Sequence, residues 1–599
     1  MSENNIPKRS EVAEENTWDL RDLFEKDEAW MREYEALKEM PARIAAFEGR
    51  LGESAETLLE FLRLEDEAEL RLTPLHTYAS CAADADTSDG FYQDMRGKAV
   101  STYVAVSSAA AFASSEIMAI DEDRLNLFYI AQPGLESYRR VLYQIRRRRA
   151  HILSPAEERL LASAAEIAAA PDRIGSSFRD ADVRFEPIID EKGEVHPLTN
   201  GTFVPLLESA DRALRRSAFE GYYTRMGQFK NTLAATLDAE FRQRLFFARA
   251  RRYDDTLSAA LDRTEVPPEV YTNLIETVHA NLDKMYRYVA LRKKLLGVDE
   301  LHMYDVYTPL VEGATRKISI DEAKATVIDA LGVLGEDYTA LLREGFAHRW
   351  LDVYGNEGKR GGAYSTGSSR PHPYVLLNHK DTLDSLFTLA HEMGHALHSY
   401  HSCKHQPVCT SDYVIFVAEV ASTCNEVLLM RYLLARTTDR LERAFLINHF
   451  LDSFKGTIFR QTMFAEFELM MGHMAERGET LTADVLSERY LALNRLYFGE
   501  NMVSDPEIAL EWTRIPHFFY NYYVFQYATG YSAAVAIANR ILTEGETAVR
   551  DYIRFLSSGS STDPISLLKI AGVDMSTPDP VNSALALFGE LVNEMEKLS

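Results

Sequence analysis

Two histidines four residues apart, with a glutamate directly after the first, are the residues of this chain best suited to chemistry. They are His391, Glu392 and His395. On a helix, positions i and i+4 lie on one face, one turn apart, so two imidazole nitrogens can bind one Zn²⁺. The intervening glutamate would lie beside a water on the metal and could act as a general base. The spacing therefore predicts part of a catalytic zinc site.

The sequence around the motif predicts two helices. Residues 381–390 carry apolar side chains at near-helical spacing and lead directly into the motif. A second helix is predicted over residues 411–426. Glu419 on this helix would complete a two-histidine, one-glutamate ligand set and leave a fourth position for water. Glu426, two turns later, could hydrogen-bond a ligating histidine from outside the ligand set.

His401 competes with Glu419 for the role of third ligand, because it falls where the longer pattern HExxHxxGxxH places its third histidine. That pattern needs a glycine three residues after the second histidine, to end the helix and turn the chain back. Here this position is His398, so the helix is predicted to continue, which favours Glu419. In this interpretation His398, His401 and His405 are polar residues near a helix end, where cations complement the dipole.

A second cluster of polar aromatic residues lies far along the chain. Residues 517–531 contain His517 and five tyrosines, and they predict a helix on which Tyr520, Tyr523 and Tyr527 share a face. Composition alone favours an aromatic core helix. Buried phenols need hydrogen-bond partners, however, and a zinc peptidase needs donors aimed at the oxyanion of the tetrahedral intermediate. With a zinc motif present, we favour the functional interpretation.

These motifs together resemble the oligoendopeptidase F family of thimet-oligopeptidase-like zinc metallopeptidases. The resemblance is carried by the glycine-rich stretch 358–367, residues 373–378, and the segments HEMGHALHSYHS, DYVIFVAEVASTCNE and IPHFFYNYYVFQYATGYSAA. Residues 17–24 and 302–310 also look familiar from this family, so the resemblance spans essentially the whole chain. It implies a mainly α, bilobal fold with a small β-sheet next to the active-site helix. It also implies a deep channel that admits oligopeptides and excludes folded proteins.

The resemblance implies a role for each site residue. The zinc ligands would be His391, His395 and Glu419, with Glu392 as the general base. His517 and Tyr523 match residues that contact substrate, and Tyr527 matches a tyrosine that stabilises the oxyanion. The thimet branch has a further tyrosine where Gly530 falls here, and Tyr531 or Tyr520 could replace it.

The bulk composition fits an enzyme of the cytoplasm. The 599 residues carry a net charge of −26, from 65 basic and 91 acidic residues, which argues against nucleic acids and anionic membranes as partners. The four cysteines show no CxxC spacing, so we expect free thiols in a reducing compartment. Residues 1–16 lack the apolar run of a signal peptide. The longest uncharged stretch, residues 99–115, is short for a membrane span and is expected to form a closely packed buried helix.

Most of the chain predicts helices, and strands are expected in two places. Residues 183–189 and 195–204 predict a hairpin. Residues 359–364 and 374–377 predict a second small sheet just before the zinc helix. An edge strand there could pair with the substrate backbone, and Gly362 could contact substrate. The glycines at 361, 362 and 367 could equally be ordinary loop residues. We divide the chain into an N-terminal helical region, 1–200, and a catalytic region, 201–599.

Two alternative functions remain open on the sequence. A zinc carboxypeptidase on a related helical fold would also carry HExxH, and it would need a basic group for the substrate's free C-terminus. Arg514 could supply that group. A catalytically inactive peptide-binding protein is the alternative from another class. The intact Glu392 argues against it, because a protein that only binds peptides needs no general base.

Overall fold

A computed structural model describes residues 6–311, 317–366 and 371–598. The chain forms two compact units, each assembled from three separate segments. Unit 1 comprises residues 1–150, 315–432 and 537–572, and unit 2 comprises residues 151–314, 433–536 and 573–599. Gly367 of the glycine-rich stretch lies outside the described residues. The division of the chain at residue 200 remains a prediction.

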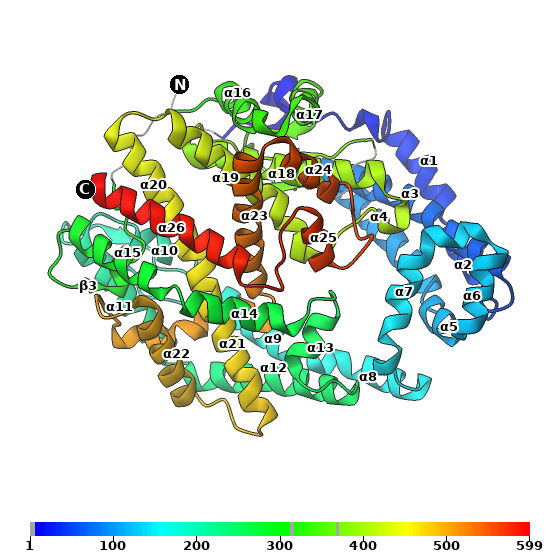
Figure 1. Ribbon diagram of the computed structural model, residues 1–599, viewed down its shortest axis with the longest axis horizontal. Helices are drawn as coiled ribbons and strands as arrows, with labels where there is room; N and C mark the ends of the chain where they lie inside the picture. Colours follow the sequence, from blue (N-terminus) through cyan, green and yellow to red (C-terminus); the bar gives the residue numbers. More distant parts are fainter. Residues whose placement is uncertain (1–5, 312–316, 367–370, 599) are drawn as a thin grey trace. The chain divides into compact units, whose positions relative to one another are not determined.

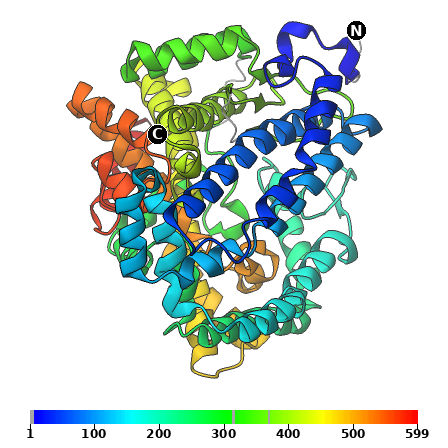
Figure 2. The same cartoon turned by 90° about the vertical axis from the view of Figure 1, so that its right-hand side faces the viewer.

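Unit 1 contains an N-terminal group of helices and the helix that carries the His391–His395 motif (Figure 1). Its helices are α1 (Asp27–Leu37), α2 (Met40–Ala45), α3 (Ala55–Ala85), α4 (Gly90–Ala109), α5 (Ala113–Ala119), α6 (Glu122–Ala131), α7 (Arg139–Arg147), α16 (Ile320–Ala330), α17 (Glu336–Ala347), α18 (Leu383–His405), α24 (Glu546–Leu556) and α25 (Pro564–Ile570). Helices α1, α3 and α4 pack side by side (Figure 2). They enclose an apolar core in which the Trp30 indole nitrogen donates to the Leu75 carbonyl, 2.8 Å away.

Unit 2 is also built mainly of helices. They are α8 (Pro155–Ala168), α9 (Ala170–Ser177), α10 (Phe203–Leu207), α11 (Arg212–Gly227), α12 (Lys230–Ala250), α13 (Thr256–Asp262), α14 (Pro268–His279), α15 (Leu282–Leu295), α20 (Arg440–Phe454), α21 (Arg460–Glu476), α22 (Ala483–Phe498) and α26 (Asp579–Leu598). Two further helices, α19 (Ile415–Arg436) and α23 (Phe525–Glu544), contain a boundary between the units within their length. The predicted mainly α fold is confirmed.

Three small sheets complete the described structure. In unit 1, β4 (Leu351–Asp352), β6 (Val375–Leu376) and β5 (Tyr364–Ser365) pair in the order β4-β6-β5, with β5 antiparallel to β6. Helix α18 contacts β5 and β6, so the small sheet lies next to the zinc helix, as predicted. In unit 2, β1 (Ile188–Ile189) pairs with β2 (Val195–His196), and β3 (Leu301–His302) pairs with β7 (Met502–Val503).

Local signals explain where the zinc helix begins and ends. Thr382 caps α18 by accepting a hydrogen bond from the Ser385 backbone N–H, and the helix continues to His405, two residues before Pro407. The predicted second helix is present as α19, which begins at Ile415. Both helices that were expected to carry ligands therefore form, although α19 begins four residues later than the predicted start at 411 and ends at Arg436 instead of residue 426.

Two local predictions were wrong. The second strand expected to extend to residue 204 ends at His196, because Phe203–Leu207 form a helix whose Phe203 and Leu207 side chains are buried. Residues 99–115 are not closely packed, since Val100, Tyr103 and Val104 on α4 are 45–56% exposed. A stretch of small uncharged residues thus indicates a helix without showing that all its faces are covered.

In the part of the chain that the structure describes, no individual helix is both long and apolar enough to span a membrane. The pair Gly90–Ala119 and Glu122–Ala131, bent by 106°, meets the length and composition criteria only when taken together.

Candidate metal centre and aromatic cluster

The structure brings the three preferred ligand residues together on α18 and α19 in unit 1. The Nε2 atoms of His391 and His395 are 3.1 Å apart, and Glu419 Oε2 lies 3.3 and 3.4 Å from them. Atoms that bind one tetrahedral zinc at about 2.0–2.1 Å lie roughly 3.3 Å from each other. The three atoms therefore fit a tetrahedral cation and would supply three of its four ligands.

Neighbouring side chains orient two of these ligands. His391 Nδ1 hydrogen-bonds Glu426 Oε1, the contact that the sequence suggested. This bond fixes the ring and leaves Nε2 for the ligand group. The Ser422 hydroxyl donates to the Glu419 carbonyl at 3.0 Å and reaches Glu419 Oε2 at 3.4 Å. Glu419 is thus held by its own helix, and His391 by the facing helix.

The electrostatics of the group suit a cation. Burial would lower the pKa of His391, but hydrogen bonds to Glu419 and Glu426 outweigh it and raise that pKa to about 10. Hydrogen bonds from His391 and His395 hold the pKa of Glu419 well below its usual range, against the effect of burial. Burial raises the pKa of Glu392, which is 7% exposed. A cation among the three ligand atoms would be stabilised by the Glu419 carboxylate.

Gly394 and Asn425 position the metal centre, and sequence reasoning missed both. A Cβ on Gly394 would lie 2.5 Å from Ser422 Cα and 2.9 Å from the Ala421 carbonyl oxygen, so only glycine permits this crossing of α18 and α19. Asn425 is fully buried and donates to the Ala390 carbonyl at 3.1 Å. A glycine inside a predicted helix was a usable signal, because it is unfavourable there without a packing reason.

The histidines that follow the motif stay on the continuing helix. His398 is buried, with its ring stacked 3.7 Å from that of Tyr413, and burial lowers its pKa to about 3. His401 is also buried, and neither ring nitrogen has a hydrogen-bond partner in the described structure. It is not part of the group formed by His391, His395 and Glu419.

Gly362 lies in the turn before β5. It has a φ of +84°, and its carbonyl accepts a hydrogen bond from Asn378 Nδ2 at 2.8 Å. A positive φ explains why glycine occupies this position. Contact between Gly362 and substrate remains a prediction.

The predicted aromatic helix is wrong in its first half. His517 lies in a 3₁₀ turn, Pro516–Phe519, and α23 begins only at Phe525, so Tyr520 and Tyr523 precede the helix. Asn521 and Tyr522 adopt positive φ values of 51° and 58°, which an α-helix does not allow.

The break is held by tertiary hydrogen bonds that the sequence could not show. The Tyr522 backbone N–H donates to Glu468 Oε1 at 2.8 Å, and its hydroxyl lies 2.7 Å from Thr256 Oγ1. Side-chain contacts with two other helices of unit 2 therefore override the helical preference of this segment.

The aromatic side chains still gather, within unit 2. The His517 ring centroid lies 5.5, 6.5 and 5.6 Å from those of Tyr520, Tyr523 and Tyr527. His517 Nε2 and Tyr527 Oη are 3.3 Å apart, and burial lowers the pKa of His517. Tyr531 packs edge to face on Phe454 and is 8% exposed. Among the tyrosines of the cluster, Tyr520 is the exposed one, at 48%.

A second His/acid group forms on the β1–β2 hairpin of unit 2. It comprises Asp190, Glu194 and His196. The Asp190 carboxylate accepts the backbone N–H groups of Lys192 and Glu194 and lies 3.2 Å from His196 Nε2. These contacts are those of a stabilised turn, and they account for the cluster without a ligand.

Comparisons with known proteins identify the family of this chain. The family model described as "Peptidase family M3" matches residues 205–587, and the model described as "Oligopeptidase F" matches residues 116–185. The chain belongs to peptidase family M3. This M3 peptidase is a metalloendopeptidase, and it is 47% identical over 595 residues to oligopeptidase PepF of Bacillus subtilis, covering 99% of this chain and 89% of the relative. It is 40% identical to group B oligopeptidase PepB of Streptococcus agalactiae, covering 100% of this chain and 99% of that protein.

Solved structures match this M3 peptidase over nearly their whole length. A crystal structure of a protein from Chlamydophila abortus is 33% identical, with a TM-score of 0.94, covering 99% of this chain and 100% of the other. The structure of oligoendopeptidase-F from Enterococcus faecium is 37% identical, with a TM-score of 0.73, covering 96% and 99%.

Proposed function

We propose that this M3 peptidase is a zinc-dependent oligoendopeptidase that hydrolyses internal bonds of short peptides. The observation that carries the proposal is the close approach of His391 Nε2, His395 Nε2 and Glu419 Oε2 on two helices, with Glu392 between the two histidines. The printed names of its relatives, oligopeptidase and oligoendopeptidase, support peptides as the substrate class.

The residues of the metal centre would have different roles. His391, His395 and Glu419 would hold one zinc ion, and Glu426 would keep the His391 ring in place. When bound, zinc lowers the pKa of a water molecule and polarises the scissile carbonyl. The Glu392 carboxylate accepts a proton from the attacking water and later gives it to the departing amine.

The aromatic cluster would contact the substrate. In this proposal Tyr527 donates a hydrogen bond from Oη to the developing oxyanion, and His517, Tyr523 and Tyr520 contact the peptide. The resemblance to the family supports these roles, as does the hydrogen-bond distance between His517 and Tyr527. Gly362 would contact a peptide backbone beside β5.

The contacts of Arg514 favour internal cleavage over carboxypeptidase action. Its guanidinium donates to Glu511 Oε1 at 2.7 Å and to Tyr223 Oη at 3.3 Å, and its side chain is 16% exposed. These contacts engage the Arg514 guanidinium, which the carboxypeptidase alternative would need in order to bind the free C-terminal carboxylate of a substrate. A cytoplasmic location, the lack of nucleic-acid and membrane partners, and a deep substrate channel remain predictions.

A peptide with an acetylated N-terminus and an amidated C-terminus tests the proposal directly. We expect the zinc-loaded protein to cut it internally, as mass spectrometry of the products would show, and a chelator to stop the reaction until zinc is restored. Release of single residues, and only from peptides with a free C-terminus, would instead establish the carboxypeptidase alternative.

Two substitutions separate catalysis from metal binding. Glu392→Gln should keep zinc and lose nearly all turnover, because the base is gone while the ligands stay. His395→Ala should lose both zinc and turnover. His405→Ala removes an exposed histidine from the same helix and should change neither. Metal content by emission spectrometry and initial rates on the blocked peptide give the readouts. Wild-type cleavage by Glu392→Gln would disprove the mechanism.

A further inference from the structure

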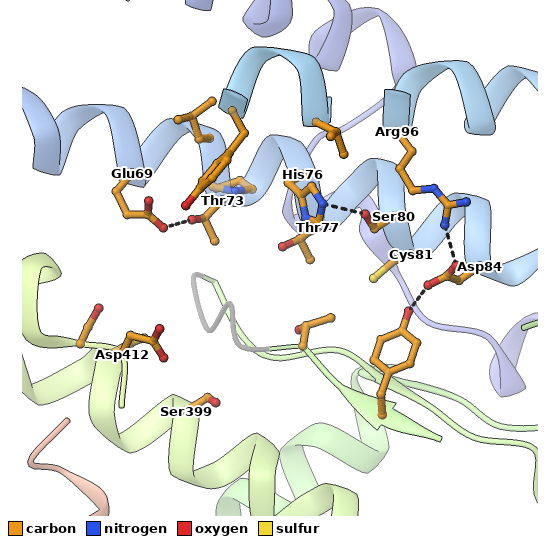
Figure 3. A pocket seen from close by; sticks show the side chains of 18 of the residues that line it. Glu69, Thr73, His76, Thr77, Ser80, Cys81, Asp84, Arg96, Ser399 and Asp412 are labelled. Carbon is orange, nitrogen blue, oxygen red and sulfur yellow. Dashed lines mark hydrogen bonds and ion pairs between the residues drawn. The ribbon is translucent and has the colours of Figure 1, made fainter. Parts of the chain in front are cut away.

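Figure 3 shows a cavity of about 850 Å³ in unit 1. The described residues that line it all belong to this unit, and they do not include His391, His395 or Glu419. Helices α3 and α4 form one side of it. The other side is formed by the turn before β5, β5 itself, the C-terminal half of α18 and the segment 408–413 that follows α18. A volume of this size is typical of clefts that bind small molecules or short peptide segments. The cavity can therefore hold one substrate side chain together with its backbone.

The floor of the cavity lies on the zinc helix itself. Ser399, which lines the cavity, follows His395 by four residues on α18, so both project from the same side, about 6 Å apart along the axis. The Ser399 hydroxyl lies 2.9 Å from Tyr413 Oη, and Tyr413 stacks on His398. A rigid wall of the cavity thus begins one helical turn from a candidate zinc ligand.

The cavity also adjoins the free edge of a strand. Because the sheet order is β4-β6-β5, the outer edge of β5 pairs with no strand among the described residues. Tyr364 of β5 and Thr366, which directly follows the strand, both line the cavity. A peptide paired with this edge would send alternate side chains from the same face into the cavity.

The carboxylates that line the cavity differ in whether a basic side chain neutralises them. Asp84 is 2% exposed and is paired with Arg96 at 2.9 Å and Arg360 at 3.1 Å, which neutralise it. Glu69 and Asp412 line the cavity too, and in Figure 3 they lie toward the end away from Asp84.

Neither of these two carboxylates has a basic partner in the described structure. Glu69 accepts a hydrogen bond from the Thr73 hydroxyl at 2.5 Å, and Asp412 Oδ1 accepts the Tyr413 backbone N–H at 2.8 Å. Both keep further oxygen lone pairs free to accept hydrogen bonds. The described residues therefore make this end of the cavity acidic.

Apolar side chains line the cavity together with these carboxylates. Leu70, Val100 and Tyr103 line it and are 41%, 45% and 50% exposed. A long basic side chain suits this combination, because its methylene stem packs on apolar surface while its charged head reaches a carboxylate.

We propose that this cavity binds a lysine or arginine side chain of the peptide substrate, within about three residues of the cleaved bond. The stem packs against α3 and α4, and the charged head lies between Glu69 and Asp412. The inference rests on the proposed function, because it takes β5 and the zinc helix to be where the peptide lies. It makes this M3 peptidase selective for basic residues at one substrate position.

Binding to zinc-loaded Glu392→Gln protein tests this selectivity without turnover. The probes are blocked, fluorescently labelled peptides in which lysine or norleucine occupies each position in turn. At one position we expect lysine to bind about tenfold more tightly, the size of one charge-assisted contact at a partly exposed site. The preference should weaken as salt rises, because the carboxylates are exposed to solvent. Equal binding of lysine and norleucine at every position would overturn the proposal.

Variants of the two carboxylates locate the effect. Adding Glu69→Gln and Asp412→Asn to the Glu392→Gln protein should reduce the lysine preference to below about twofold. Both amides keep the local hydrogen bonds and lose only the charge. The control pair Glu48→Gln and Glu60→Gln removes the same charge from exposed positions of unit 1 outside the cavity and should leave the preference intact. A preference that survives in the Glu69/Asp412 variant would overturn the proposal.

Cleavage by the protein with Glu392 intact separates this inference from the proposed function. Cleavage of blocked peptides with no lysine preference in binding would retain the peptidase and refute the basic pocket. A lysine preference that depends on Glu69 and Asp412, in a protein that cuts no peptide, would retain the pocket and refute the oligoendopeptidase.

Discussion

At the scale of single residues, two of the three candidate ligands are held in different ways. His391 is fixed at Nδ1 by Glu426, whereas the Glu419 carboxylate is steadied by Ser422 on its own helix. A ligand whose orientation is set before the metal arrives loses less conformational freedom on binding. Both supports lie on α19, so this helix contributes to the metal centre beyond its single ligand.

Tyr527→Phe tests the role proposed for the aromatic cluster. Removing one oxyanion donor commonly lowers kcat by about 10²–10³, and we expect a loss of that size with zinc affinity unchanged. Tyr286→Phe is the matched control. It removes a hydroxyl that donates to the Leu496 carbonyl in unit 2, so rates should stay near wild type. Initial rates on the blocked peptide and a zinc titration give the readouts. A Tyr527→Phe protein with the wild-type kcat would exclude this tyrosine from catalysis.

At the scale of elements, the metal centre depends on how closely α18 and α19 cross. Gly394 lies one residue before His395 and faces Ser422 on α19, three residues after Glu419. The position that permits close contact is therefore adjacent in sequence to ligands on both helices. A small separation of the helices would move Glu419 away from both histidines, because the three ligand atoms come from two rigid elements.

Gly394→Ala should weaken zinc binding at least tenfold and destabilise the protein by about 1–3 kcal/mol, because its Cβ would collide with the backbone of α19. Gly97→Ala makes the same change on α4, where a Cβ meets nothing within 4 Å. This control should stabilise the protein by about 0.5–1 kcal/mol and leave zinc affinity unchanged. Thermal unfolding and zinc titration measure both effects. Wild-type zinc affinity in Gly394→Ala would show that the crossing can relax.

The elements also show which features the sequence could predict. The helices α18 and α19 followed from the local sequence, and for α18 the signal was the apolar spacing that leads into the motif. The break before α23 did not, because it depends on Glu468 and Thr256 holding Tyr522 from other helices. The paired Glu426 could be proposed from spacing, whereas the cavity could not. Its walls come from α3 and α18, which are distant in sequence and leave no joint local pattern.

At the scale of the whole molecule, both units bury charged and phenolic groups that need fixed partners. In unit 1, Asp352 is fully buried between Arg9 and Lys359. In unit 2, Glu511 is 2% exposed and pairs with Arg460 and Arg514, and these cations hold its pKa at about 2 against the effect of burial. Such pairs are costly to break singly, because the remaining charge would be left without a partner.

The buried tyrosines should set the upper pH limit of the folded protein. Burial raises the pKa of Tyr271, Tyr490 and Tyr552 well above 10, whereas the same phenols in an unfolded chain ionise near pH 10. Because these pKa values are higher in the folded state, their contribution is complete below pH 10. It is lost as pH rises further, since only the unfolded chain then releases the protons. The free energy of unfolding should therefore fall above pH 10.

Phenolate absorbance at high pH, followed together with helical circular dichroism, should show this as two phases. Phenols exposed to solvent should ionise gradually near pH 10 with helix content intact. The buried ones should ionise in a cooperative step that coincides with loss of helix. Tyr552→Phe should reduce the cooperative step and leave the gradual phase unchanged. Smooth ionisation of every tyrosine near pH 10 in a fully helical protein would contradict the burial of Tyr271, Tyr490 and Tyr552.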